Sequence, residues 1–338
     1  MKTIDENETS LRNAIVIVVE PGDIEYKARL LISSLRLFAG RYKNCPIWAI
    51  NPRNMQGISQ DTLNFFREQK VNYVSKLLNK NWYNFPFFNT VYATSFVEKI
   101  LGGTVDRLIY LDSDVVCLSE PTLFSSLDSS MIAVSPSDSR NVGFQDFNSI
   151  NEYWSKIIGV LQLRIEDFWF IEARLTKELT SININNGVMC TNPNLMIFGS
   201  LASYSDELSN DAEFLKILEN YKEGAHYLDQ AILSATIVKL LNKENVYFLP
   251  EEYNFNLNFY WKSKHVGKAL DDLVFVHYHN AFYSSIWKYM FKIIEKKVFI
   301  SNHLPLETGE IKKRILSLRN GIYNIFNMVI HSKSNMNR

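Results

Sequence analysis

Residues 107–116 read Arg-Leu-Ile-Tyr-Leu-Asp-Ser-Asp-Val-Val, an apolar run that ends in two carboxylates one residue apart. The apolar part is typical of a strand buried on both faces in a parallel sheet. Because side chains alternate along a strand, we expect Asp112 and Asp114 to point the same way. Ligands of open α/β sheets bind beyond the carboxyl ends of the strands, so this stretch predicts both an α/β fold and the position of its site.

The aspartate pair has two interpretations. Two close carboxylates repel each other unless a cation joins them, and Mg²⁺ and Mn²⁺ favour oxygen ligands and substrate phosphates. Asp112-Ser113-Asp114 is therefore either a metal site for a diphosphate or an ordinary surface turn, in which Asp and Ser are favoured. The pair alone does not decide between them.

The composition narrows the class of protein. The 338 residues, 46% of them hydrophobic, suffice for one large α/β domain or two smaller ones. Lys plus Arg equals Asp plus Glu at 36 each, so the overall charge does not favour nucleic acid as a partner. Cys45, Cys117 and Cys190 are widely spaced, which favours a reducing compartment over a disulfide framework. The polar N-terminus and the absence of long apolar runs predict a cytoplasmic protein.

Predicted strands and helices alternate along the first part of the chain. Short β-branched or apolar runs predict strands over residues 14–20, 46–50, 71–74 and 131–134, and helical spacing predicts helices over residues 26–38, 60–69 and 90–101. Such alternation is typical of a mostly parallel sheet with helices on its faces.

Amide side chains gather in residues 182–190, which read Ile-Asn-Ile-Asn-Asn-Gly-Val-Met-Cys. Asn185 and Asn186 offer donors and acceptors to a ligand. Gly187 indicates a close backbone approach or a bulge. The alternative is a hairpin turn, for which Asn-Gly is the commonest signal.

Two later clusters are also polar. Asp229 and Gln230 open a predicted helix, where an aspartate is most simply a cap. Residues 273–280 read Leu-Val-Phe-Val-His-Tyr-His-Asn and predict a strand with His277 and His279 on one face. Imidazole is a common metal ligand, so one of the two could complete an oxygen-rich shell, although a histidine on a strand is often structural.

In this order the clusters resemble the metal-dependent nucleotide-sugar glycosyltransferases of the GT-A fold, most closely the family 8 group that includes glycogenin and lipopolysaccharide galactosyltransferases. The matching motifs, spread over residues 14–290, are Leu111-Asp-Ser-Asp114, Asn185-Asn-Gly187, Asp229-Gln230, Leu249-Pro250 with Tyr253-Asn254, and His277-Tyr-His-Asn280. The resemblance implies a GT-A domain over residues 1–290, with an acceptor-side insertion at about 141–180. The residues after it predict a basic, amphipathic helical extension over 291–338.

The resemblance also implies a retaining transfer of a hexose from a UDP-sugar with the help of Mn²⁺ or Mg²⁺, in the building of a glycan. Asp112, Asp114 and His277 would hold the metal, while His279 stays open as its alternative. Asp229, Gln230 and Asn185 would lie beside the sugar. The remaining donor contacts implied are Val18, Val19, Glu20, Tyr26, Lys99, Ser113, Asn186, Gly187 and Lys288, and the two lysines are candidates for the phosphates because the family's usual basic residues are displaced here.

Seven aromatic residues lie within residues 141–180. They could form a platform for an acceptor, because sugars stack on aromatic rings, or they could be part of an ordinary core.

The C-terminal part is basic, with ten Lys or Arg against three Asp or Glu over residues 288–338. Its amphipathic runs could lie on an anionic membrane, where a lipid-linked acceptor would be presented, or pack as ordinary helices. We therefore expect a cytoplasmic protein, which the first of these alternatives would place at the inner face of the membrane.

Two other classes of function remain open. A metal-dependent hydrolase could use Asp112, Asp114, His277 and His279, and a catalytically silent protein could bind the nucleotide sugar without turning it over.

Overall fold

The computed structural model describes residues 12–54, 57–264, 270–279, 295–296 and 299. The chain divides into two compact units, residues 1–256 with 272–277 and residues 257–271 with 278–338. Lys288 and nearly all of the predicted basic extension lie outside the described residues. In the second unit the described part includes a 3₁₀ segment over Leu257–Lys262.

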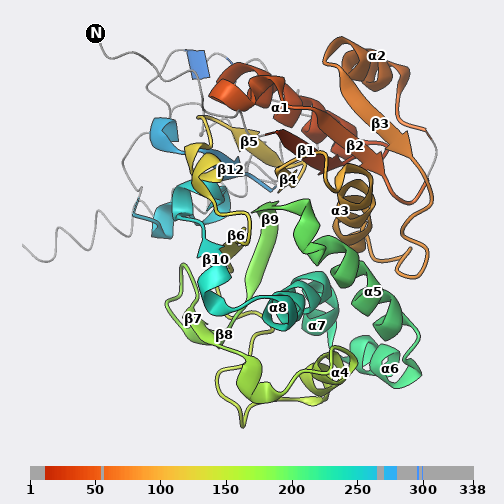
Figure 1. Cartoon of the computed structure of the whole chain (residues 1–338), viewed down its shortest axis with the longest axis vertical. Coiled ribbons are helices and arrows are strands. Elements are labelled where there is room, and N and C mark those ends of the chain that lie inside the picture. The colour runs from red at the N-terminus through yellow and green to blue at the C-terminus, as the bar shows by residue number, and fades with distance from the viewer. Residues whose placement is uncertain (1–11, 55–56, 265–269, 280–294, 297–298, 300–338) are drawn as a thin grey trace, which may run out of the picture. The chain divides into compact units, whose positions relative to one another are not determined.

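A seven-stranded sheet is the centre of the first unit (Figure 1). Its order is β10 (Val246–Phe248), β6 (Ile132–Pro136), β9 (Ile184–Thr191), β4 (Arg107–Leu111), β1 (Asn13–Val18), β2 (Ile47–Asn51) and β3 (Val71–Ser75). Only β9 runs antiparallel to its neighbours in this sheet, and the other pairs are parallel. The prediction of a mostly parallel α/β sheet is confirmed.

Helices cover both faces of this sheet, and alternate residues of each strand pack into the cores on its two faces. Ala14 and Val16 of β1 belong to the core under α3 (Phe88–Leu101), α5 (Ile197–Ser209) and α8 (Leu228–Leu240). Ile15 and Ile17 belong to the core under α1 (Asp23–Phe38) and α2 (Gln60–Glu68). The sheet is thus a buried middle layer, which explains its continuous apolar strands.

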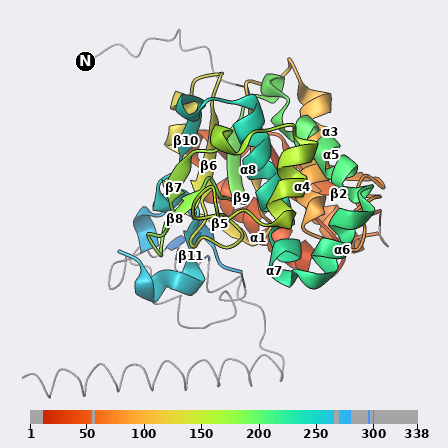
Figure 2. The same cartoon turned by 90° about the horizontal axis from the view of Figure 1, so that it is seen from below.

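Shorter helices extend the layer that contains α5. These are α4 (Glu152–Val160), α6 (Ala212–Asn220) and α7 (Lys222–His226), which pack against α5 or against one another (Figure 2). In the part of the chain that the structure describes, none of the helices combines the length and the apolar character needed to cross a membrane.

The central strand ends earlier than its sequence suggests. β4 stops at Leu111, and the next strand, β5 (Val115–Cys117), belongs to a separate sheet with β12 (Phe275–His277) and β11 (Phe255–Asn256). Between them the N–H of Val115 donates to the carbonyl of Asp112 at 3.1 Å and closes a turn. The prediction that strand alternation directs the two aspartates was therefore wrong, because the turn directs them.

The segment between β6 and β9 contains α4 and a hairpin of β7 (Phe170–Glu172) and β8 (Leu179–Ser181). Phe144, Trp154 and Phe168 are at most 3% exposed and meet one another edge to face. These three rings fill a core and are not available as a platform, whereas Phe147 is 43% exposed.

Candidate metal centre

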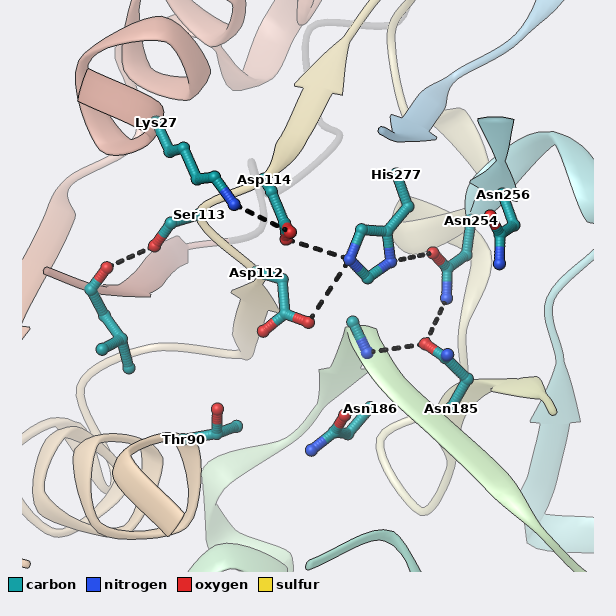
Figure 3. Close-up of polar contacts among 12 residues, drawn as sticks. Lys27, Thr90, Asp112, Ser113, Asp114, Asn185, Asn186, Asn254, Asn256 and His277 are labelled. Atoms are coloured by element: carbon teal, nitrogen blue, oxygen red, sulfur yellow. Dashed lines mark hydrogen bonds and ion pairs between the residues drawn. The ribbon is translucent and has the colours of Figure 1, made fainter. Parts of the chain in front are cut away.

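Two carboxylates and one imidazole converge at the carboxyl end of β4 (Figure 3). Asp112 and Asp114 come from the turn after β4, and His277 is the last residue of β12, opposite Val115 of β5. The Nε2 atom of His277 lies 2.9 Å from Oδ1 of Asp114 and 3.7 Å from Oδ2 of Asp112. One nitrogen and two carboxylate oxygens form a donor set that suits a divalent Mn²⁺ or Mg²⁺.

A chain of hydrogen bonds fixes which nitrogen of His277 faces the carboxylates. The backbone N–H of Gly187 donates to Oδ1 of Asn185 at 3.0 Å, and Nδ2 of Asn254 donates to the same oxygen at 2.8 Å. Oδ1 of Asn254 then lies 3.2 Å from Nδ1 of His277. Since this oxygen can only accept, Nδ1 carries the proton and Nε2 is left as the ligand atom.

The charges of the site favour a bound cation. Burial raises the pKa of Asp112 to about 6, an effect that His277 opposes and the charge of Asp114 increases. Burial alone would lower the pKa of His277, but the Asp114 and Asp112 carboxylates outweigh it and raise that pKa above its usual value. The repulsion between the two half-buried carboxylates contributes to the shift of Asp112, and their negative charge causes the shift of His277, so a divalent cation would relieve an excess of negative charge here.

The turn itself is held by its neighbours. The hydroxyl of Tyr110 donates to Oδ1 of Asp112 at 2.5 Å and lies 2.8 Å from Oγ1 of Thr90, at the start of α3. The hydroxyl of Ser113 donates to the carbonyl of Val18, at the end of β1. The position of the aspartates is therefore set by β1, β4 and α3 together.

Gly187 makes room for the imidazole. A Cβ atom added to this glycine would lie 2.7 Å from Cε1 and 2.8 Å from Nδ1 of His277. Gly187 lies within β9, where the pairing with β6 jumps from Met189 to Asn185. Of the two interpretations of Asn-Gly, the close approach and bulge are therefore correct and the hairpin turn is not.

A second buried carboxyl lies near the metal centre. Asp229, on the first turn of α8, is 3% exposed, and its Oδ2 accepts a hydrogen bond from Nδ2 of Asn186 at 2.6 Å. Burial raises the pKa of Asp229 to about 7, and the charge of Asp112 contributes to the rise. Among the described residues, Oδ1 of Asp229 and Oε1 of Gln230 have no hydrogen-bond partner, so both can accept from a polar ligand.

The residues predicted to bind the nucleotide lie at the ends of β1 and α1. Val18 ends the first strand, Val19 follows it, and Tyr26 is on the first turn of α1. Glu20 is 8% exposed and pairs with Arg53, whose Nε and Nη2 atoms each donate to one carboxylate oxygen at 2.6 Å. This ion pair compensates the buried charge of Glu20.

Lys99 is placed differently from the other candidates. Lys99 is exposed on the last turn of α3, about 13 Å along the helix from Thr90 at the rise of an α-helix. Lys99 therefore does not join the aspartates. β12 ends at His277, and His279 has a left-handed φ of 47°, so strand alternation does not relate the two histidines, and His279 stays an alternative metal ligand.

Sequence reasoning missed three residues of this site. Lys27 on α1 places its Nζ 3.4 Å from Oδ2 of Asp114, and Tyr110 and Thr90 support Asp112. A tyrosine within an otherwise aliphatic strand was the available signal for Tyr110. The signal for Lys27 was a basic residue on the second turn of the helix that follows the first strand.

Comparisons with known proteins point to one class. Residues 15–240 match the family model described as a Rhodobacterales glycosyltransferase domain. No curated protein matches the chain. Among solved structures, the chain is similar to the WbbM bifunctional glycosyltransferase in its apo form, with a TM-score of 0.51, 14% identity, and coverage of 91% of this chain and 52% of that one. At this identity the likeness concerns the fold alone.

Two other similar structures have lower TM-scores. The galactosyltransferase LgtC in complex with donor and acceptor sugar analogues gives 0.48 at 15% identity, with 89% of this chain and 99% of that chain covered. The glycosyltransferase GlyE of Streptococcus pneumoniae TIGR4 gives 0.46 at 15% identity, with 91% and 64% covered.

Proposed function

The chain belongs to the Rhodobacterales glycosyltransferase domain family, and on this premise we propose that it moves a hexose from a UDP-sugar to a glycan or lipid-linked acceptor. It is a glycosyltransferase with a GT-A fold, as the sequence predicts. The proposal adds the donor, a divalent metal, retention of the anomeric configuration and the class of acceptor.

One observation carries the proposal. Oδ1 of Asp114 and Oδ2 of Asp112 both face Nε2 of His277, at 2.9 and 3.7 Å, at the end of the central strand. These three residues would hold Mn²⁺ or Mg²⁺. A metal ion bound there would neutralise the charge that develops on the departing diphosphate.

The other polar residues act on the sugar. Asp229 would lie beside the anomeric carbon, where a carboxylate stabilises the positive charge of an oxocarbenium-like transition state. Asn186 orients Asp229 through its hydrogen bond. Gln230 offers Oε1 to a sugar hydroxyl. Because Oδ1 of Asn185 already accepts two hydrogen bonds, we assign this residue to holding His277 in place.

The proposal is tested with a panel of nucleotide sugars and Mn²⁺, by measuring nucleoside diphosphate release with and without acceptor sugars and by determining the anomeric configuration of the product by NMR. We expect transfer from a UDP-sugar with retention. Release that does not depend on an acceptor would indicate a hydrolase instead, and binding without turnover would indicate a silent binding protein.

Thermal unfolding gives a second test that does not require the acceptor. A ligand that binds only the folded state at 100 times its Kd stabilises the fold by about 2.7 kcal/mol. UDP with Mn²⁺ should therefore raise the Tm of the wild type and of Asp61→Ala, an exposed aspartate on α2, but not that of Asp114→Ala. If no nucleotide sugar binds with Mn²⁺, the proposed function is wrong.

A further inference from the structure

Lys27 extends from the second turn of α1 toward the metal centre (Figure 3). Its Nζ lies 3.4 Å from Oδ2 of Asp114, while Oδ1 of the same carboxylate faces His277. The Lys27 side chain is only 14% exposed. The ammonium of Lys27 and the imidazole of His277 thus approach the two oxygens of one carboxylate.

The ammonium group of Lys27 is only partly satisfied. A charge-assisted N–H···O bond is usually about 2.7–2.9 Å long, so the contact of 3.4 Å with Asp114 is weak. An ammonium has three N–H donors, and within the described parts of the chain Nζ makes no other hydrogen bond or ion pair. A largely buried ammonium with unused donors costs free energy unless a ligand completes its hydrogen bonds.

The balance of charge indicates which kind of ligand would complete the hydrogen bonds of Lys27. Counted over Asp112, Asp114 and Lys27, a bound divalent cation leaves one positive charge, on the ammonium that lies beside Asp114. A cationic or neutral ligand would not compensate it. The diphosphate of a nucleotide sugar would compensate this positive charge, and it gains further negative charge when its bond to the sugar breaks.

We propose that Lys27 binds the diphosphate of the nucleotide-sugar donor, and that without a nucleotide its charge opposes the binding of a divalent cation at Asp114. The inference rests on the proposed function and names a residue that this function had left without an assignment. Lys27 takes the role that the sequence suggested for Lys99, whereas Lys288 lies outside the described residues.

Two binding measurements on the full chain test the inference. The affinities of UDP and uridine are measured by calorimetry in the presence of Mn²⁺, and the affinity of Mn²⁺ alone is measured from the EPR signal of the free ion. The variants are Lys27→Met, Lys27→Arg, which keeps the charge, and Lys99→Met, which removes an exposed lysine at the far end of α3.

Lys27→Met should weaken UDP binding roughly 10- to 100-fold, the usual effect of losing a hydrogen bond to a charged group. Its affinity for Mn²⁺ alone should rise a few-fold, because a competing positive charge is gone. Uridine binding should stay unchanged, since uridine has no phosphate, Lys27→Arg should retain most of the affinity for UDP, and Lys99→Met should match the wild type.

Two outcomes would overturn the inference and leave the proposed function standing: undiminished UDP binding in Lys27→Met, or equal losses of UDP and uridine, which would indicate a structural role. A wild-type chain that binds UDP, GDP, ADP and CDP no better than uridine would overturn the proposed function and this inference with it.

Discussion

Replacing Gly187 by alanine should disrupt the metal centre through a steric contact with His277. The added Cβ would lie 2.7 Å from Cε1 of the imidazole, whereas ordinary contacts begin at 3.4 Å, so the ring must retreat by about 0.7 Å. The hydrogen bonds of the ring to Asn254 and Asp114, 3.2 and 2.9 Å long, cannot both survive such a movement. Loss of the groups that orient a metal ligand usually costs 10- to 100-fold in metal affinity, and we expect roughly that loss for Mn²⁺.

The assay is a Mn²⁺ titration in the presence of UDP, followed by the EPR signal of the free ion, together with urea unfolding of the metal-free chain. Overpacking should cost about 1–3 kcal/mol of stability. Gly57→Ala is the matched control, because a Cβ there meets nothing within 4 Å. The stability cost of Gly187→Ala should largely disappear in a His277→Ala background, since the shortest contacts of the added Cβ are with the imidazole.

Wild-type affinity for Mn²⁺ in Gly187→Ala would refute the reasoning, because His277 would then not need its observed position to bind metal. An equal stability cost with and without the imidazole would show that the strain lies elsewhere.

Three further predictions concern buried polar groups. Burial raises the pKa of Glu98 from 4.5 to about 7, so its contribution to stability is complete below pH 4.5 and is lost as the pH rises through 7. The lost contribution is worth about 3 kcal/mol. In urea unfolding, this pH dependence of stability should disappear in Glu98→Gln and remain in Glu219→Gln, a change on the exposed face of α6. Tyr110→Phe removes the hydrogen bond to Asp112 and should weaken Mn²⁺ binding roughly tenfold, and an unchanged affinity would mean that the turn needs no support from β4. Burial raises the pKa of Asp229 to about 7, and the ionised carboxylate is the form that stabilises a cation, so the transfer rate should increase as the pH rises through 7. Asp229→Asn should abolish this increase and lower the rate at least 100-fold. A wild-type rate that falls over the same pH range would contradict the role of this carboxylate.

The sheet was predictable because its strands are local and strongly apolar. Leu108 to Leu111 are at most 1% exposed, as a doubly covered strand requires. The turn after Leu111 was not predictable by the same rule, since alternation holds only while the strand continues. Its geometry depends on the hydroxyl of Ser113, which binds the carbonyl of a residue 95 positions earlier.

The site was predictable as a set of residue types, but the partner of each residue was not. The amides of Asn185 and Asn186 were recognised as a cluster, yet they act differently, because one contacts Asn254, 69 residues away, and the other contacts Asp229, 43 residues away. Lys27 escaped notice for the same reason, since its contact with Asp114 spans 87 residues. Sequence patterns describe neighbours along the chain, whereas these contacts are made by tertiary packing.

The pairing of β12 with β5 has a consequence for biosynthesis. Asp114 and its histidine partner are 163 residues apart, and His277 reaches the aspartates only when β12 adds to β5. At a translation rate of 5–20 residues per second, the two carboxylates leave the ribosome roughly 10–30 s before the imidazole does. During that interval the nascent chain can form β1 to β4 without a complete set of metal ligands. The capacity to bind the metal should therefore appear late, and fragments that end before β12 should be inactive even when their sheet has folded.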